Sequence, residues 1–190
     1  MGKYMQAGTL ALALIGATAS PGAADLLIED FGADADRRWG YVADRVMGGV
    51  SQGQLRFETE DTQSFARLTG TVSTDNNGGF IQFRASVRDG LPDWTSGLRL
   101  KVKGNSAEYY VFLRTIDMRR PWHSYRASFE TTGDWQTVDM DLSAFKSSRG
   151  YMPKTLDPTK VIGIGIVAYG RDFEADLSVS EIRLLQDGDA

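Results

Sequence analysis

Apolar and polar residues alternate along most of this 190-residue sequence, and the alternation decides which folds the chain can adopt. Successive side chains of a β-strand point to opposite faces, so a period of two is typical of a strand with one buried face. Glycine, asparagine and aspartate, which favour chain reversals, separate these runs. The alternating apolar positions are Leu55/Phe57, Ala66/Leu68/Val72, Ile81/Phe83/Ala85/Val87, Leu98/Leu100/Val102, Val111/Leu113, Val138/Met140/Leu142 and Leu177/Val179. We therefore predict many short, half-buried strands.

Three further segments refine this prediction. The run 161–168 is apolar on both faces apart from its glycines, which indicates a central, covered strand. In the last strand the apolar phase changes between Val179 and Ile182, which indicates a bulge between them. Short helical turns are expected near residues 142–145 and 157–160, and no longer window has the helical period. The sequence therefore predicts an all-β fold, an antiparallel two-sheet sandwich of the jelly-roll type.

The first 24 residues have the composition of a secretory signal peptide. A lysine precedes an apolar run that ends at Ala19, and small residues follow the run up to Ala24. The run is shorter than the ~20 apolar residues that a membrane-spanning helix needs. We expect cleavage after Ala24, with cleavage after Ala19 and an uncleaved N-terminal anchor as alternatives. Residues 25–190 would then form a single β-sandwich domain, periplasmic or extracellular, that is not an integral membrane protein.

Composition excludes several classes of protein. The chain has no cysteine, which excludes disulfides, a lipoprotein anchor, thiolate metal ligands and a cysteine nucleophile. Its formal net charge of -4 argues against a nucleic-acid partner. We predict no metal and no cofactor, because its Asp-x-Asp pairs do not continue into a calcium loop and Gly163 and Gly165 lack the rest of a dinucleotide motif. A structural calcium ion in a loop stays open as an alternative.

Gly49, Ser51 and Gly53 have the Gly-x-Ser-x-Gly spacing with which hydrolases present a nucleophilic serine. Such a serine needs a strand before it, a helix after it, and a histidine and an acid nearby. Here an alternating strand follows Ser51, and nothing around His123, the single histidine, marks it as catalytic. We therefore interpret the match as accidental and predict that the protein is not an enzyme.

Two glycine-containing loops are candidate binding loops. The first holds two adjacent glycines flanked by short polar side chains that can hydrogen-bond to loop amides. We interpret it as a tight structural corner with its methionine in the core, and a rigid loop that grips a ligand or partner is the alternative. We interpret the second loop as a hairpin turn, and a binding loop is the alternative. The residues concerned are Asp44, Met47, Gly48, Gly49 and Ser51 in the first loop, and Asn76 and Asn77 in the second.

Aromatic and arginine side chains occupy the polar phases of three predicted strands. If these strands share a sheet, the side chains form one exposed face. Arginine outnumbers lysine fifteen to six in this chain, and exposed aromatic and arginine residues dominate the energetics of protein interfaces. The guanidinium group also suits carboxylates, sugar hydroxyls and aromatic rings. The candidate binding residues are Arg84, Tyr110, Phe112, Arg114, Trp122 and Arg126.

The segment 39–51, which runs from Trp39 through Asp44 to Met47-Gly48-Gly49 and Ser51, resembles the opening motif of the complex I intermediate-associated protein 30 family. Later features follow in the family's order: Asn77-Gly78-Gly79-Phe80, Arg84, Tyr109-Tyr110, Arg114, Trp135, Phe145, Arg149-Gly150 and Ile162-Gly163-Ile164-Gly165. The resemblance covers roughly residues 25–185 and implies a galactose-binding-like jelly roll that acts as an assembly chaperone without an established active site.

We therefore expect a non-enzymatic binding or assembly-factor domain whose partner is a protein, such as a respiratory or other membrane complex. The predicted leader departs from the family's mitochondrial members, so the expected fold carries over from the resemblance and the identity of the partner stays open. The alternative is an extracytoplasmic module that binds a carbohydrate or another small ligand.

Overall fold

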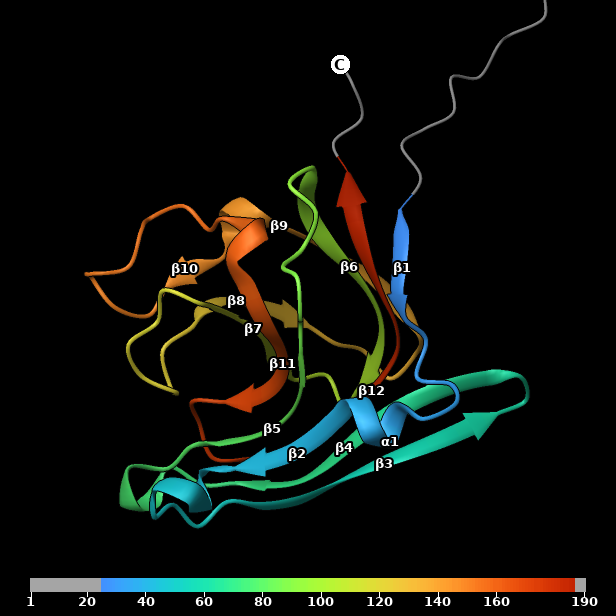
Figure 1. Cartoon of the computed structure of the whole chain (residues 1–190). Helices are drawn as coiled ribbons and strands as arrows, with labels where there is room; N and C mark the ends of the chain where they lie inside the picture. The colour runs from blue at the N-terminus through green and yellow to red at the C-terminus, as the bar shows by residue number, and fades with distance from the viewer. Residues whose placement is uncertain (1–24, 187–190) are drawn as a thin grey trace, which may run out of the picture.

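The computed structural model describes residues 25–186, which form two antiparallel sheets packed face to face (Figure 1). Sheet A has the strand order β3-β4-β12-β6-β9, with β1 paired to β12, and sheet B has the order β10-β8-β7-β11-β5-β2. The strands of sheet A are β1 (Leu26–Glu29), β3 (Gln52–Glu60), β4 (Gln63–Val72), β6 (Thr95–Gly104), β9 (Gln136–Asp141) and β12 (Phe173–Gln186). Those of sheet B are β2 (Trp39–Ala43), β5 (Phe80–Ser86), β7 (Glu108–Thr115), β8 (Tyr125–Glu130), β10 (Lys146–Ser147) and β11 (Val161–Tyr169). The predicted all-β sandwich is confirmed.

Within residues 25–186, helical structure is limited to five short segments. They are α1 (Ala35–Arg38) and the 3-10 turns η1 (Asp44–Met47), η2 (Asp75–Asn77), η3 (Leu142–Ala144) and η4 (Pro158–Lys160). The turns η3 and η4 confirm the two helical turns expected from the sequence. In each, an aspartate just before the turn accepts a hydrogen bond from a backbone amide, which caps the turn.

The core lies between the sheets and is built from the alternating residues. On β7, Tyr109, Val111 and Leu113 are fully buried, whereas the residues between them are only half-buried. The same alternation places Leu68 of β4 and Leu100 of β6 in the core. The period of two therefore identified the buried face of these strands, because each strand has one sheet face against the core and one against solvent.

Two finer predictions about strands are also confirmed. The strand β11 pairs with β7 on one side and β5 on the other, and Ile164 and Ile166 on it are buried. In β12 the register with β6 shifts between Val179 and Glu181, which is the predicted bulge. Beyond it, β12 exchanges its neighbour β4 for β1, so that Leu26 pairs with Leu184 (Figure 1).

The interpretation of Asn76 and Asn77 as a hairpin turn is wrong. The strands on either side of them, β4 and β5, belong to different sheets, so the connection crosses the sandwich. Both asparagines have positive φ angles, 56° and 59°, which this residue type tolerates better than most. Residues that tolerate positive φ occur both in hairpin turns and in connections between sheets, so the local sequence does not distinguish the two.

The predicted signal peptide, residues 1–24, lies outside the described residues. Within residues 25–186, no helix is long and apolar enough to cross a membrane.

Candidate functional site

The motif loop, which we define as residues 44–51, is organised around the carboxylate of Asp44. Asp44 is fully buried, and its Oδ1 accepts a hydrogen bond from the Ser51 amide at 3.0 Å. Its Oδ2 accepts from the Ser51 hydroxyl at 2.5 Å and from the amides of Gly79 and Phe80 at 2.6 and 3.2 Å. The Ser51 Oγ in turn accepts from the Ser73 amide at 3.0 Å. One side chain therefore joins the start of β3 to the connection between β4 and β5.

These contacts also determine the charge of the carboxyl group. Burial raises the pKa of Asp44, but the hydrogen bonds from Ser51, Gly79 and Phe80 outweigh it and hold the pKa below its usual value. Asp44 is therefore ionised near neutral pH. The prediction that Asp44 and Ser51 organise loop amides is confirmed by these contacts.

The glycines around Asp44 have two different structural roles. Gly48 ends η1 with φ of 91°, and a Cβ there would meet no atom within 4 Å. Gly49 has no positive φ, but a Cβ on it would lie 2.5 Å from Oδ1 of Asp44. Gly78 likewise packs against the Asp44 carboxylate, with no room for a side chain. Gly48 is therefore needed for its backbone conformation and Gly49 for close packing.

We expect Gly49→Ala to lower the free energy of unfolding by about 2 kcal/mol or more, since a methyl group would displace a buried hydrogen-bonded carboxylate. Gly48→Ala should cost only about 1 kcal/mol, because strain in φ is its sole penalty. Denaturant unfolding followed by tryptophan fluorescence measures both variants. Equal costs at the two positions would contradict the assignment of different roles.

Ser51 does not have the strand-to-helix geometry of a hydrolase's nucleophilic serine. It is only 1% exposed, its hydroxyl is engaged by Asp44 and Ser73, and the strand β3, not a helix, follows it. The Nδ1 atom of His123 lies instead 2.6 Å from the Tyr151 hydroxyl. These contacts give the Gly-x-Ser-x-Gly spacing a structural explanation.

The tip of the motif loop exposes apolar side chains. Val46 is 74% exposed, Met47 48% and Val50 42%. The interpretation that Met47 fills core space is therefore wrong: η1 turns this side chain outward. Asn76 and Asn77 are exposed on the neighbouring connection, which Asp44 holds through Gly79. The structure thus brings the two candidate loops together.

Most of the predicted aromatic and arginine residues lie on the outer face of sheet B. In one row across the sheet, Arg126 pairs with Phe112, Phe112 with Gly165, and Gly165 with Arg84. Tyr110 and Arg114 flank Phe112 on the same face of β7. We call the set Arg84, Tyr110, Phe112, Arg114, Arg126 and Tyr169 the arginine-aromatic face. Its centre, on β11, carries no side chain at Gly163 and Gly165.

Tyr169 was missed by the sequence analysis, and it completes the aromatic cluster. Its ring centroid lies 5.6 Å from that of Tyr110 and 5.3 Å from that of Phe112. Arg126 covers this cluster, with its guanidinium 4.5 Å from the Phe112 centroid and 4.9 Å from that of Tyr169. It also donates to the Tyr169 hydroxyl at 2.9 Å. Extending the period of two through Gly163, Gly165 and Val167 would have identified Tyr169.

Trp122 is not on this strand face. The strand β8 begins at Tyr125, so Trp122 lies in the preceding turn. Trp122 is 49% exposed, and its carbonyl oxygen lies 3.4 Å from a donor nitrogen of Arg126. It therefore borders the arginine-aromatic face rather than belonging to it.

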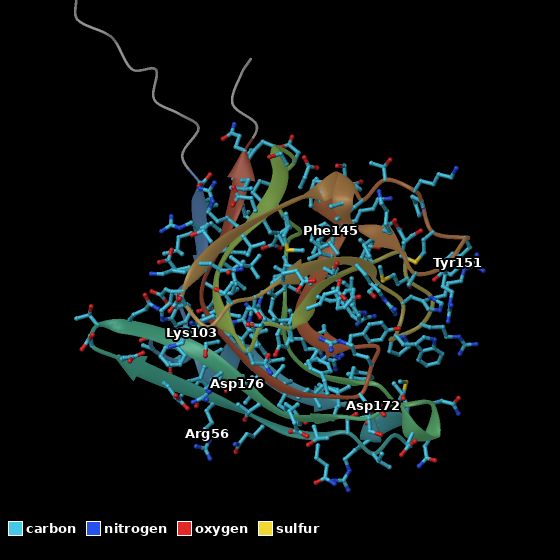
Figure 2. All side chains as sticks on the ribbon, turned by 180° about the vertical axis from the view of Figure 1, so that it is seen from behind. Arg56, Lys103, Phe145, Tyr151, Asp172 and Asp176 are labelled. Atoms are coloured by element: carbon cyan, nitrogen blue, oxygen red, sulfur yellow. The ribbon has the colours of Figure 1, made fainter. Side chains whose placement is uncertain are left out.

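A hollow of about 450 Å³ opens on the outer face of sheet A, on the other side of the sandwich. Trp135 stands edge-on to Phe65 there, with ring centroids 5.6 Å apart, and Arg67 forms an ion pair with Asp176 at 2.8 Å. Figure 2 shows Asp176 and Lys103 close together over this sheet. No local sequence pattern indicates this hollow, because its walls come from β3, β4, β12, β6 and the loop before β9. Within the described residues, no group of three or more histidine, cysteine, aspartate or glutamate side chains could hold a metal ion.

The fold resembles carbohydrate-binding modules of known structure. The family 11 module of the cellulase Lic26A-Cel5E of Clostridium thermocellum superimposes with a TM-score of 0.72 at 18% identity, covering 88% of this chain and 97% of that one. The same family's module in complex with a β-1,3-1,4-mixed-linked tetrasaccharide gives 0.71 at 18% identity, over 87% and 98% of the two chains. A family 30 module gives 0.56 at 16% identity, over 87% and 100%. The fold is therefore a jelly-roll sandwich like that of these modules.

A model of the family Complex I intermediate-associated protein 30 matches residues 30–179. The chain belongs to this family, as the motif loop indicated. Comparison with curated protein sequences gives no significant match. Family and fold together fit a non-enzymatic binding domain.

Proposed function

We propose that this domain binds a partner protein through the arginine-aromatic face and the exposed tip of the motif loop. The observation that carries the proposal is the exposure of Val46, Met47 and Val50 on a loop held rigid by Asp44. Exposed apolar side chains on a rigid support lose little entropy on docking, and apolar, aromatic and arginine residues are those that dominate protein interfaces.

The tip and the face are continuous. Tyr169 of the face pairs with Phe80, and the amide of Phe80 donates to Asp44. The Gly170 amide also donates to the Gly79 carbonyl at 2.9 Å, which joins the end of β11 to the same connection. A partner that contacts Tyr169 therefore lies next to the motif loop. The family's name supports an assembly-factor role. The predicted leader favours a partner outside the cytoplasm, and a membrane complex is the kind of partner that we propose.

The test is site-specific photocrosslinking in the organism's own envelope, with the full chain carrying benzoylphenylalanine at one position. Val46, on the tip, and Trp122, at the border of the face, should each give the same crosslinked protein. Thr137 is the control, because it is exposed on β9 of sheet A. No crosslinked protein from Val46 or Trp122, or the same product from Thr137, would contradict the proposal.

A second candidate function, saccharide binding, is favoured by the hollow on sheet A. It combines an aromatic wall, Trp135, with polar side chains such as Glu58 and Lys103, a combination suited to neutral sugars. The rings of the arginine-aromatic face suit sugar stacking less well, because Arg126 covers Phe112 and Tyr169. The β-1,3-1,4-mixed-linked tetrasaccharide bound by a protein of similar fold is the first probe to use.

If this second function holds, calorimetry should detect binding of the tetrasaccharide, and Trp135→Ala should abolish it while Trp122→Ala leaves it unchanged. Absence of heat with the wild-type protein, or equal loss in both variants, would reject the hollow as a saccharide site.

A further inference from the structure

The arginine-aromatic face carries positive charge without negative partners. Arg84, Arg114 and Arg126 form no ion pair with any of the described residues. On sheet A, by contrast, Arg67 forms an ion pair with Asp176 and Arg99 with Asp139. Two acidic residues share the outer face of β7 and β8: Glu108 and Glu130 lie opposite each other at the end of these strands away from Arg114, and the Glu108 carboxylate accepts from the Tyr110 hydroxyl at 2.9 Å.

The lack of a partner is clearest at Arg114. Its Nε is buried and has no hydrogen-bond partner among the described residues. Burial and the neighbouring charge of Arg84 both lower the pKa of Arg114. A buried donor without an acceptor costs free energy, and two like charges near one another add to that cost. An anion between the two arginines would remove both penalties.

The backbone leaves space for such an anion. Arg84 pairs across the sheet with Gly165 of β11, and Arg114 pairs with Gly163 of the same strand. The central strand β11 therefore carries no side chain between the two arginines. The Gln82 carboxamide of the neighbouring strand β5 reaches toward Gly165. The Arg126 guanidinium already donates to the Ser124 and Tyr169 hydroxyls. It therefore contributes positive charge and its stacking on the aromatic rings, but it has no free pair of donors for a bidentate contact.

We propose that the partner protein docks on this face through an acidic segment whose carboxylates bind Arg84 and Arg114. The inference rests on the proposed function, because it assumes that the occupant is a polypeptide. Guanidinium groups bind carboxylates bidentately, which gives both affinity and orientation. The exposed apolar tip of the motif loop, next to the face, favours a polypeptide with apolar as well as acidic side chains over an acidic polysaccharide.

The first test uses the full chain and two fluorescent twelve-residue peptides, one alternating glutamate with leucine and phenylalanine, the other with glutamine in place of glutamate. Anisotropy at low salt should show binding of the glutamate peptide at least about tenfold tighter than of the glutamine peptide. Arg84→Gln should weaken the glutamate peptide by about tenfold. Arg56→Gln is the matched control, because Arg56 is exposed on β3 of sheet A and has no ion pair among the described residues (Figure 2).

Arg114→Met supplies a readout that a structural role would not give. Removing an unsatisfied buried charge should leave the melting temperature unchanged or raise it, whereas binding of the glutamate peptide should fall about tenfold. Equal binding of the two peptides, no binding of either, or tighter Arg84-dependent binding of polygalacturonate or heparin oligosaccharides would overturn the acidic-segment proposal.

Photocrosslinking separates this inference from the proposed function. If the Val46 crosslink to a protein persists undiminished in Arg84→Gln and at high salt, the protein-binding function stands and the acidic-segment inference fails. If the crosslink falls in Arg84→Gln but not in Arg56→Gln, both are supported. If no protein is crosslinked in any variant, the proposed function itself fails.

Discussion

Replacing Asp44 with alanine is expected to lower the free energy of unfolding by about 3–5 kcal/mol, which is at the upper end for a single substitution. The variant loses four hydrogen bonds to a charged acceptor, and it leaves the buried donors of Ser51, Gly79 and Phe80 without that acceptor. The motif loop and the connection between β4 and β5 would also lose the side chain that joins them. The melting temperature should fall by about 10 °C.

Denaturant unfolding and a thermal melt measure this loss. Asp93→Ala is the control, because Asp93 is exposed, and its cost should stay within about 0.5 kcal/mol. Asp44→Asn keeps an acceptor but not the charge and should fall between wild type and Asp44→Ala. A loss below about 1 kcal/mol in Asp44→Ala would show that solvent or other groups satisfy these donors.

Glu29→Ala should be the second most destabilising change, at about 3 kcal/mol. Glu29 is a buried carboxylate at the end of β1, and its Oε2 accepts from the Trp39 indole at 2.8 Å. Arg38 binds both of its oxygens, at 2.9 and 2.7 Å, and the Phe31 amide donates at 2.7 Å. Glu60→Ala, at the exposed end of β3, is the control and should change stability little. Similar unfolding curves for the two alanine variants would disprove the anchoring role of Glu29.

Both carboxylates make stability depend on pH in the same direction. Burial raises the pKa of Glu29, but hydrogen bonds from Arg38, Trp39 and Phe31 outweigh it, so its pKa, like that of Asp44, lies below the ordinary value. Stability from a depressed pKa is complete above the unfolded value, about 4, and is lost as pH falls through the folded value. Wild type should therefore lose stability below about pH 4, and Glu29→Gln should flatten this dependence.

The sequence predicted the strands well because the evidence for them is local. Alternation within β7 and the phase change in β12 involve neighbouring residues only, and both were interpreted correctly. The short apolar strand β1 has no alternation, so it was not predicted. The partners of Asp44 at Gly79 and Phe80 come from 35 and 36 positions away, and no local pattern shows such contacts.

Part of the arginine-aromatic face was also predicted from local alternation, and the rest was not. On β5 and β7 the phase of the strand was correct, so Arg84 and Arg114 were placed on one surface. On β8 the strand was started too early, which put Trp122 on the face instead of at its border. The absence of ion pairs at the three arginines of the face depends on which strands are neighbours in sheet B, and only the fold gives that order.

The pairing of β1 with the end of β12 determines where a linker or a fused domain would leave the sandwich. Leu26 lies directly opposite Leu184, so the two ends of the sandwich leave it at one point on the edge of sheet A. A tether or fusion attached to either end of the sandwich therefore starts from the same place on sheet A. Joining the ends by a short linker and opening the chain at the β3–β4 turn would give a circularly permuted protein with the same strand neighbours.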